Sequence, residues 1–266
     1  MSKIHETAII EKGAEIADDV EIGAYAFIGA KVRIGKGTIV GHSAHIEGRT
    51  TIGEGNKIFP LSSLGTAPQD LKYNGEDTEL IIGDRNVFRE FCQVNLGTAQ
   101  GGGNTRIAGD CLFMGHTHIA HDCQIGNRVI IANFVPLAGH IEIGDFAVIG
   151  GQSAVHQFVR IGRNSMIAGA SAVSQDVPPF SLVEGNRATI RGLNLTGLRR
   201  HFDHAAIDGV KSVFKEIFRK NHAAKTAAES ILAERGDSLS AEAKELCQFI
   251  IDSKRGVPQM RAEESE

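Results

Sequence analysis

The chain has 266 residues, of which 28 are basic and 32 acidic, and it combines 31 glycines with only 6% aromatic residues. This near balance of charge argues against a dedicated nucleic-acid binder and against a polybasic membrane binder. No run of about 18 apolar residues is present, and the first residues lack the apolar core of a secretory leader. Four cysteines without a CxxC pair favour a reducing compartment. We therefore expect a soluble, cytoplasmic protein.

From the N-terminus onward, an aliphatic residue recurs at every sixth position. A period of six matches neither the α-helix, with about 3.6 residues per turn, nor a simple alternating strand. It fits a short strand followed by a corner, three of which close a triangular coil, with the aliphatic residues stacked as an internal ladder. The unbroken series comprises Ile4, Ile10, Ile16, Ile22, Ile28, Ile34, Val40, Ile46, Ile52, Ile58 and Leu64.

The position after the aliphatic residue is often glycine, as at Gly23, Gly35 and Gly53. Glycine adopts backbone angles that other residues avoid, so we expect these glycines to relieve the steric cost of the corners. The fourth residue after the aliphatic is small or β-branched, as at Ala26 and Val32, and is predicted to point inward as well.

Two segments interrupt the repeat. The first, 65–79, is polar and contains proline and glycine, and the second, 100–105, is glycine-rich and shifts the phase by one residue. The repeat then continues from Ile107 to Val173. Loops that leave a rigid scaffold commonly carry binding groups, although a tolerated surface insertion is the alternative.

The repeat ends at Pro178-Pro179, and beyond about residue 190 the apolar spacing becomes helical. Thr226 and Glu229 have the spacing of a capping box, which predicts the start of a helix there. The sequence thus predicts a repeat domain over 1–189 and a helical domain over 190–266. The helical domain is expected to cover the open end of the solenoid, where a bare sheet edge would otherwise be exposed.

Histidines gather in the middle of the repeat outside the inward phase: His116, His118, His121, His140 and His156. With about 18 residues per coil, His121 and His140 should be neighbours on adjacent coils. Asp122 follows His121 directly, and a histidine beside a carboxylate is a plausible general base. No serine-elbow or phosphate-binding loop motif is present, so direct attack by a substrate hydroxyl is the simplest chemistry.

Several short motifs stand in and around the repeat: QDLKY (69–73), IGDRN (82–86), GTAQGGG (97–103), HIAHDCQIGN (118–127), LAGH (137–140), AVHQF (154–158) and QDVPP (175–179). Together they resemble one family, the UDP-N-acetylglucosamine acyltransferases that begin lipid A synthesis. The resemblance implies a left-handed parallel β-helix followed by a small helical domain, assembled as a homotrimer. It also implies transfer of an (R)-3-hydroxyacyl chain from acyl carrier protein to the 3-hydroxyl of UDP-N-acetylglucosamine, without cofactor or metal.

Matched position by position, the resemblance implies that His121 is the general base, that Asp122 orients it, and that the Gly139 N–H stabilises the oxyanion. Gly169 and Arg187 would set the acyl length, with glycine implying a longer chain. The residues expected to contact substrate are Gln69, Asp70, Lys72, His118, His140, His156, Gln157, Asn194, Arg199 and Arg200.

Four positions depart from the family pattern: Asn95 and Leu96 stand where a His and an Arg are frequent, Thr196 where a Glu is common, and His201 where an Arg often follows the basic pair. These departures leave the 3-amino analogue of the sugar open as acceptor.

Three other readings remain open from the sequence. One is a hexapeptide acetyltransferase that uses acetyl-CoA, and another is a scaffold without catalysis. The third is a zinc trimer of the carbonic-anhydrase type, because His116 and His121 have its spacing, although the third histidine expected near Leu80 is absent.

Overall fold

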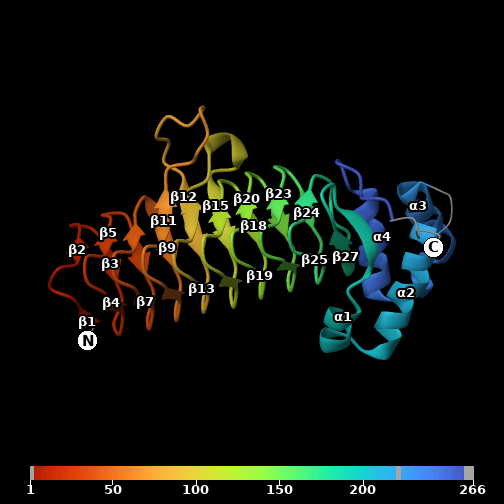
Figure 1. Ribbon diagram of the computed structural model, residues 1–266, viewed down its shortest axis with the longest axis horizontal. Helices are drawn as coiled ribbons and strands as arrows, with labels where there is room; N and C mark the ends of the chain where they lie inside the picture. Colours follow the sequence, from red (N-terminus) through yellow and green to blue (C-terminus); the bar gives the residue numbers. More distant parts are fainter. Residues whose placement is uncertain (1–2, 220–222, 261–266) are drawn as a thin grey trace.

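The computed structural model describes residues 3–219 and 223–260. Most of it is a column of stacked coils, with four helices at one end (Figure 1). Each coil contributes one short strand to each of three sheets, and consecutive coils pair in parallel, as for Ile4 with Ile22. The parallel β-helix that the period of six predicted and the helical C-terminal region that the later apolar spacing predicted are both confirmed. Within the described residues no helix is both long and apolar enough to cross a bilayer.

The three sheets are named here for their order along the first coil. Sheet A contains β1 (Lys3–Ile4), β4 (Glu21–Ile22), β7 (Ile39–Val40), β10 (Lys57–Ile58), β13 (Val87–Phe88), β16 (Leu112–Phe113), β19 (Ile130–Ile131), β22 (Val148–Ile149), β25 (Met166–Ile167), β27 (Ser181–Glu184) and β28 (Thr189–Leu193). Sheet B contains β2 (Ile9–Ile10), β5 (Phe27–Ile28), β8 (His45–Ile46), β11 (Ser63–Thr66), β14 (Gln93–Asn95), β17 (His118–Ile119), β20 (Pro136–Leu137), β23 (Ala154–Val155) and β26 (Ala172–Val173). Sheet C contains β3 (Glu15–Ile16), β6 (Arg33–Ile34), β9 (Arg49–Ile52), β12 (Glu79–Ile82), β15 (Asn104–Ile107), β18 (Gln124–Ile125), β21 (Glu142–Ile143) and β24 (Arg160–Ile161).

The interior is the ladder that the sequence predicts. The second residue of each two-residue strand is buried from Ile22 onward, whereas the first faces outward. Phe88 and Phe113 stack inside the column with ring centroids 4.8 Å apart. Burying this apolar stripe coil after coil supplies the main stabilisation, at roughly 25 cal/mol per Å² removed from water. Ile4 is 43% exposed because the first coil has a neighbour on one side only.

The corners are built differently from our expectation for glycine. Residues with positive φ make the turns, and most are not glycine, as at Tyr25 and Phe146. Gly23, directly after the aliphatic residue, is not among them. A Cβ there would approach the His42 backbone nitrogen of the next coil to 2.7 Å. Glycine is needed at this position because adjacent coils come close together, so the expectation that it relieves turning strain is wrong.

The two interruptions leave the column beside each other at one edge (Figure 1). The first emerges between β11 and β12, and the second lies between β14 and β15 and contains the short 3-10 turn η1 (Ala99–Gly101). Strand β14 ends at Asn95 and β15 begins at Asn104, so this second loop spans 96–103 and both begins and ends earlier than predicted. Within it, Thr98 caps η1 by accepting from the Gly101 N–H.

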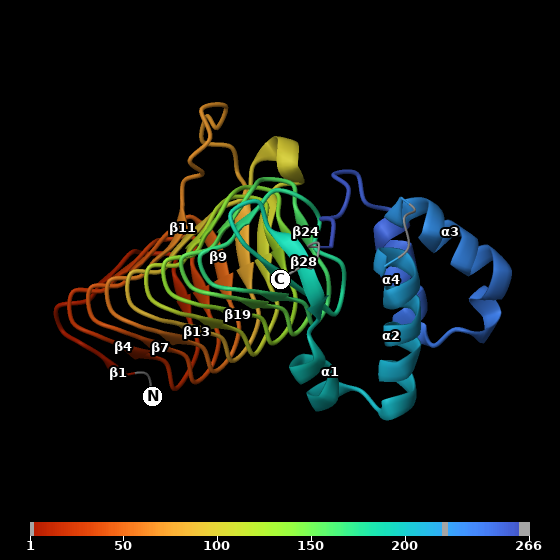
Figure 2. The same cartoon turned by 45° about the vertical axis from the view of Figure 1, so that its right-hand side comes forward.

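Helices cover the C-terminal end of the column: α1 (Leu195–His201), α2 (His204–Arg219), α3 (Ala224–Arg235) and α4 (Ala241–Ile251) (Figure 2). A short 3-10 turn, η2 (Gly236–Ser238), links α3 to α4. The helical region begins at Leu195 rather than at residue 190, since β28 still pairs with β27. The predicted capping box is wrong, because α3 already includes Thr226 and its N-cap is Ala223 without a side-chain hydrogen bond.

Candidate active site

The corner between sheets B and C carries one turn residue on each of three successive coils, and we call Asp122, His140 and Phe158 the dyad corner. All three have positive φ, at 62°, 61° and 64°. The spacing of 18 residues stacks them along the column, and the rings of His140 and Phe158 lie 4.4 Å apart. His121 precedes this corner by one residue, which brings its ring to 5.1 Å from that of His140, edge to face.

His121 and Asp122 form a hydrogen-bonded pair. The His121 Nδ1–H donates to Asp122 Oδ2 at 2.7 Å. Neighbouring side chains on a strand diverge, but the left-handed turn at Asp122 brings its carboxylate back to the ring. The Asp122 side chain is fully buried and that of His121 is 13% exposed. Because a carboxylate only accepts, Nδ1 carries the proton and Nε2 is left as the free acceptor.

Gly139 lies against the other side of the His121 ring. A Cβ at this position would come within 2.6 Å of His121 Cε1 and 2.9 Å of Nε2, so no side chain fits there without moving the ring. Within the part of the chain that the structure describes, no group accepts a hydrogen bond from the Gly139 N–H. The site thus offers a basic nitrogen and a free amide donor on neighbouring coils, as acyl transfer requires.

Two further histidines surround this pair. His118 Nδ1 bonds the Gln93 Oε1 at 3.0 Å, and His140 Nε2 lies 3.7 Å from Asp122 Oδ2. Burial lowers the pKa of His118, and the neighbouring His121 lowers it further. Burial also lowers the pKa of His140, against an opposing effect of the Asp122 carboxylate. Both rings are therefore neutral at pH 7 and can donate to or accept from a substrate.

The first loop reaches the same region. The negative charge of Asp70 opposes the lowering of the His140 pKa by burial, so this carboxylate lies near the dyad corner. Asp70 accepts from the Lys72 N–H at 3.0 Å, while the side chains of Gln69 and Lys72 face solvent. His156 and Gln157 are exposed one coil beyond His140.

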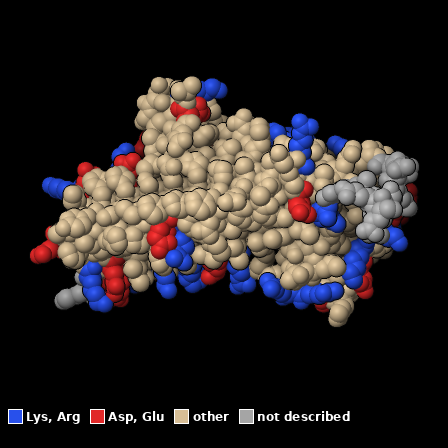
Figure 3. Space-filling model, in the orientation of Figure 1, with Lys and Arg blue, Asp and Glu red and all other residues tan. Residues whose placement is uncertain are grey.

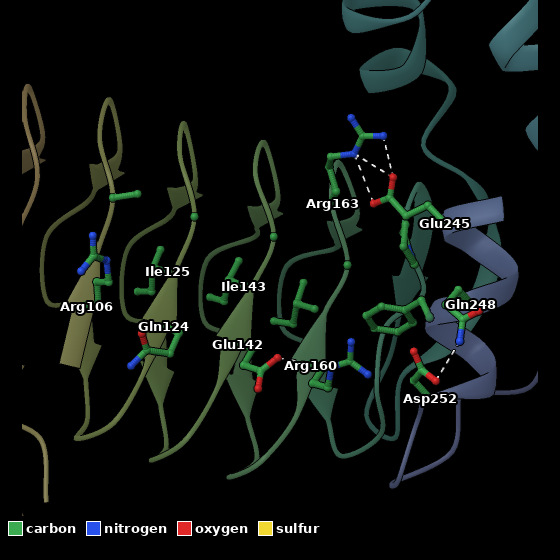
Figure 4. A pocket seen from close by; sticks show the side chains of 17 residues that line it. Arg106, Gln124, Ile125, Glu142, Ile143, Arg160, Arg163, Glu245, Gln248 and Asp252 are labelled. Carbon is green, nitrogen blue, oxygen red and sulfur yellow. Dashed lines mark hydrogen bonds and ion pairs between the residues drawn. The ribbon is translucent and has the colours of Figure 1, made fainter. Parts of the chain in front are cut away.

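A cavity of about 1010 Å³ begins at Asp122 and His140 and continues along sheet C to Lys254 and Arg255. A second cavity, of about 690 Å³, lies between sheet C and α4 (Figure 4). Its walls are held by an ion pair of Arg163 with Glu245 at 2.6 Å. Because this pair joins the column to α4, the second cavity lies at the seam between the two. The first cavity is lined by Asp122 and His140 but not by His121 or Gly139.

Three predicted contact residues lie elsewhere in the same chain. Asn194 caps α1 by accepting from the Gly197 N–H, and its amide donates to the Asn164 carbonyl. Arg199 and Arg200 are exposed on the same helix. Helix α1 lies at the corner between sheets C and A, away from the two loops (Figure 1). One chain therefore does not bring these residues to His121.

Gly169 and Arg187 lie at the C-terminal end of the column, and both are exposed. Gly169 follows β25, and the segment containing Arg187 pairs with β26 through the bridge between Asn186 and Ala172. A Cβ at Gly169 would lie 3.3 Å from the Gly151 carbonyl oxygen, so a side chain there is tightly placed and points outward.

The departures from the family pattern fall into two groups. Asn95 and Leu96 are buried, and the Asn95 amide donates to Thr66 and Ala67 at the base of the first loop. Thr196 is exposed on α1, and the His201 ring packs on Phe146 at 4.4 Å. The Asn95 amide N–H groups thus brace the base of the first loop, while Asn95 Oδ1 has no hydrogen-bond partner among the described residues.

The sequence analysis missed two residues of the site. Thr98 donates to both oxygens of Asp122, and Gln93 holds His118. Neither position stands out by residue type. A signal for Gln93 existed in the register, because it lies exactly one coil before His118 in sheet B. Thr98 lies inside the second loop, outside any strand, so no register relation pointed to it.

The zinc interpretation finds little support in this geometry. His116 stacks between Phe91 and Phe134 at the corner between sheets A and B, at the other end of β17 from His121. Among the described residues, only His121, Asp122 and His140 converge closely enough to share an ion. In that group the Nδ1 of His121 is engaged by Asp122.

Comparison with known proteins gives one consistent family. Residues 176–258 match the model described as UDP N-acetylglucosamine O-acyltransferase, domain 2, and residues 1–36 match the bacterial transferase hexapeptide model. The acyl-[acyl-carrier-protein]–UDP-N-acetylglucosamine O-acyltransferase of Sulfurovum sp. is 52% identical over 97% of this chain and 98% of its own length. The one from Sulfurimonas denitrificans is 54% identical over 98% and 99%.

Solved structures agree with this assignment. The UDP-N-acetylglucosamine acyltransferase from Campylobacter jejuni superposes with a TM-score of 0.93 at 45% identity, over 97% of this chain and 100% of the other. The Francisella novicida enzyme of the same name gives 0.92 at 35% identity, over 96% and 94%. The chain is therefore an acyltransferase and belongs to the acyl-[acyl-carrier-protein]–UDP-N-acetylglucosamine O-acyltransferase family.

Proposed function

We propose that this protein transfers an (R)-3-hydroxyacyl chain from acyl carrier protein to the 3-hydroxyl of UDP-N-acetylglucosamine, the first step of lipid A biosynthesis in the cytoplasm. The observation that carries the proposal is the pair of His121 and Asp122, with the carboxylate fully buried and Gly139 against the ring. The relatives' names give the substrate classes, and this pair gives the chemistry.

In the proposed reaction, His121 Nε2 removes the proton from the sugar 3-hydroxyl as its oxygen attacks the thioester carbonyl carbon. Asp122 keeps Nδ1 protonated and stabilises the imidazolium that forms. The Gly139 N–H donates to the oxyanion of the tetrahedral intermediate. Collapse breaks the carbon–sulfur bond, and the proton held by His121 passes to the thiolate of the carrier. No covalent acyl-enzyme is needed.

The residues around the dyad corner and those of the first loop are assigned to substrate positioning. His118 and His140 are neutral and lie near His121, so they suit hydroxyl and carbonyl groups. Asp70, with Gln69 and Lys72 beside it, approaches from the loop. The exposed His156 and Gln157 extend the contact surface by one coil.

We infer a homotrimer in which each site is shared between two chains. Asn194, Arg199 and Arg200 lie on α1 at a different corner from His121, so a neighbouring copy would have to bring them to the diphosphate. A guanidinium fork matches phosphate oxygens well. Figure 3 supports a packing surface, because a broad band along the β-helix carries few charged side chains.

The acyl chain is assigned to the outer face of sheet B. Pro136, Ala154 and Ala172 continue the register of His118 toward the C-terminal end, and each places a small apolar side chain on this face. This track ends in the region of Gly169. A long hydrocarbon can therefore extend from the thioester along the column.

Gly169→Met is expected to shift the preferred donor to shorter acyl chains, because the added side chain can only project outward into the end of this track. The measurement compares kcat/KM for hydroxyacyl carrier proteins of several lengths, with Gly169→Ala as an intermediate case. An unchanged chain preference would refute the assignment of Gly169 as the length-determining residue.

The function itself is tested by incubating the protein with UDP-N-acetylglucosamine and hydroxyacyl carrier proteins of several lengths, and following the product by mass. We expect a mass increase equal to one hydroxyacyl group on the sugar nucleotide. A parallel reaction with the 3-amino analogue identifies the acceptor atom, and one with acetyl-CoA tests the acetyltransferase reading. Transfer only to the amino sugar, only from acetyl-CoA, or from no donor would each overturn the proposal.

A further inference from the structure

The second loop, 96–103, is packed directly on the Asp122 carboxylate. Thr98 donates its backbone N–H to Oδ1 at 2.8 Å and its hydroxyl to Oδ2 at 2.6 Å. Thr98 is 1% exposed and the Asp122 side chain is fully buried, so water does not compete for these bonds. The only other donor to the carboxylate in hydrogen-bond range is His121. Asp122 is therefore oriented by two residues alone among those described.

The loop is also shaped to direct these donors. The Thr98 hydroxyl accepts from the Gly101 N–H at 3.2 Å, so its own hydrogen must turn toward the carboxylate. A Cβ at Gly101 would overlap the Asp122 carboxylate, which means that the loop backbone closes over the acid at this point. In β15, directly after the loop, the Thr105 hydroxyl accepts from the Asp122 N–H at 2.8 Å.

These contacts address a physical difficulty of the site. A carboxylate that is fully removed from water is costly unless donors satisfy both of its oxygens. If His121 were the only donor to the Asp122 carboxylate, the carboxylate could rotate about its side-chain bonds and break its hydrogen bond with the ring. The Thr98 N–H is the one donor to Oδ1 among the described residues, and the Thr98 hydroxyl shares Oδ2 with His121 Nδ1. The direction of Oδ2 toward the ring is thereby fixed.

We propose that Thr98 is a positioning residue for the acyl transfer: with Gly101 it clamps the Asp122 carboxylate so that His121 keeps Nδ1 protonated and Nε2 free. This proposal rests on His121 being the base in the proposed function. It gives the second interruption of the repeat a role of its own, since the inserted residues supply the donors that a regular coil would not place there.

The test compares Thr98→Val with Thr98→Ser in steady-state kinetics. Valine removes the hydroxyl at nearly the same size and keeps the backbone N–H, whereas serine keeps the donor. A hydrogen bond to a charged group is strong enough that we expect kcat to fall about ten- to hundredfold in Thr98→Val. KM for the sugar nucleotide should stay within about twofold, because Thr98 is buried away from substrate. Thr98→Ser should restore most of the activity.

Thr38→Val is the matched control. Thr38 is equally buried in the repeat, and its hydroxyl likewise donates, to the Gly53 carbonyl at 3.0 Å, and accepts, from the Asn56 N–H. It lies several coils from Asp122, so its loss should affect stability but leave kcat unchanged. Thr98→Ala removes the same donor without adding a methyl group beside the carboxylate, so the test does not depend on one variant folding.

A second readout follows the hydrogen bond itself. The proton shared by His121 Nδ1 and Asp122 should give a low-field proton resonance that is lost in Thr98→Val and retained in Thr98→Ser and Thr38→Val. Wild-type kcat in Thr98→Val and Thr98→Ala, or an equal loss in Thr98→Ser, overturns the proposal. If His121→Ala is inactive while the Thr98 variants are normal, only the clamp is wrong. If His121→Ala is fully active, the base assignment fails first.

Discussion

His121→Ala is expected to reduce kcat by about a hundredfold to ten-thousandfold, the usual contribution of a positioned general base. The three atoms nearest to a Cβ at Gly139 all belong to the His121 ring, so this ring is the group placed against the free amide. His118 is tied to Gln93, and its pKa is lowered by burial, which makes it a poorer base. KM for UDP-N-acetylglucosamine should change little. Initial rates measured by product mass, with donor and acceptor each varied, provide the test.

His116→Ala is the matched control for this variant. His116 belongs to the same coil, but it stacks between Phe91 and Phe134 at another corner. We expect it to keep wild-type kcat. The same pair of variants distinguishes the base assignment from the zinc interpretation, which assigns a metal-binding role to both histidines. Equal loss in the two variants, or full activity in His121→Ala, would contradict the base assignment.

The repeat could be predicted from the sequence because its cause is local and periodic. An inward aliphatic residue in every sixth position can be satisfied only by a closed coil, so the ladders from Ile22 onward and the neighbouring positions of His121 and His140 followed from counting. The exposed first coil at Ile4 is the one place where the ladder has nothing to cover it on one side.

The hydrogen bond between His121 and Asp122 could not be derived in the same way. It depends on the left-handed backbone conformation of Asp122, and the flanking residues do not predict that conformation for an aspartate. The prediction that glycine relieves strain in the turns was wrong for a related reason. Gly23 is required because the next coil comes close to it, and this is a contact between residues far apart in the chain. Contacts of this kind become visible only when the coils are stacked.

Residues separated by an insertion were the hardest to place. Thr98 lies 24 residues before Asp122. This separation is four repeats of six but not one coil of 18, because Thr98 belongs to the second loop, which interrupts its coil. The helix α1 shows the opposite case. Its basic pair was found by resemblance, yet nothing in the sequence indicates that α1 sits at another corner from His121. The period of six thus predicts the stacked coils, but it does not place the residues that the two loops and α1 carry.

Asp122→Asn is expected to lower kcat by about a thousandfold or more while leaving the fold intact, because asparagine has the same shape. If its NH₂ group replaces Oδ1, it faces the Thr98 N–H, and two donors oppose each other. If it replaces Oδ2, it donates to His121 Nδ1, and the ring must then carry its proton on Nε2, where it cannot act as a base. In catalytic triads the same substitution costs about ten-thousandfold through the wrong tautomer.

The double variant His121→Ala/Asp122→Asn decides whether Asp122 acts through His121. If its only catalytic role is to orient that ring, removing it after the ring is gone costs nothing further, and the double variant should have the kcat of His121→Ala. Rates are compared only for variants whose melting temperature equals that of the wild type. A double variant slower than His121→Ala by the full Asp122→Asn factor would mean that the two residues act independently. The carboxylate would then have to serve the substrate directly, which its complete burial beneath Thr98 and Gly101 argues against.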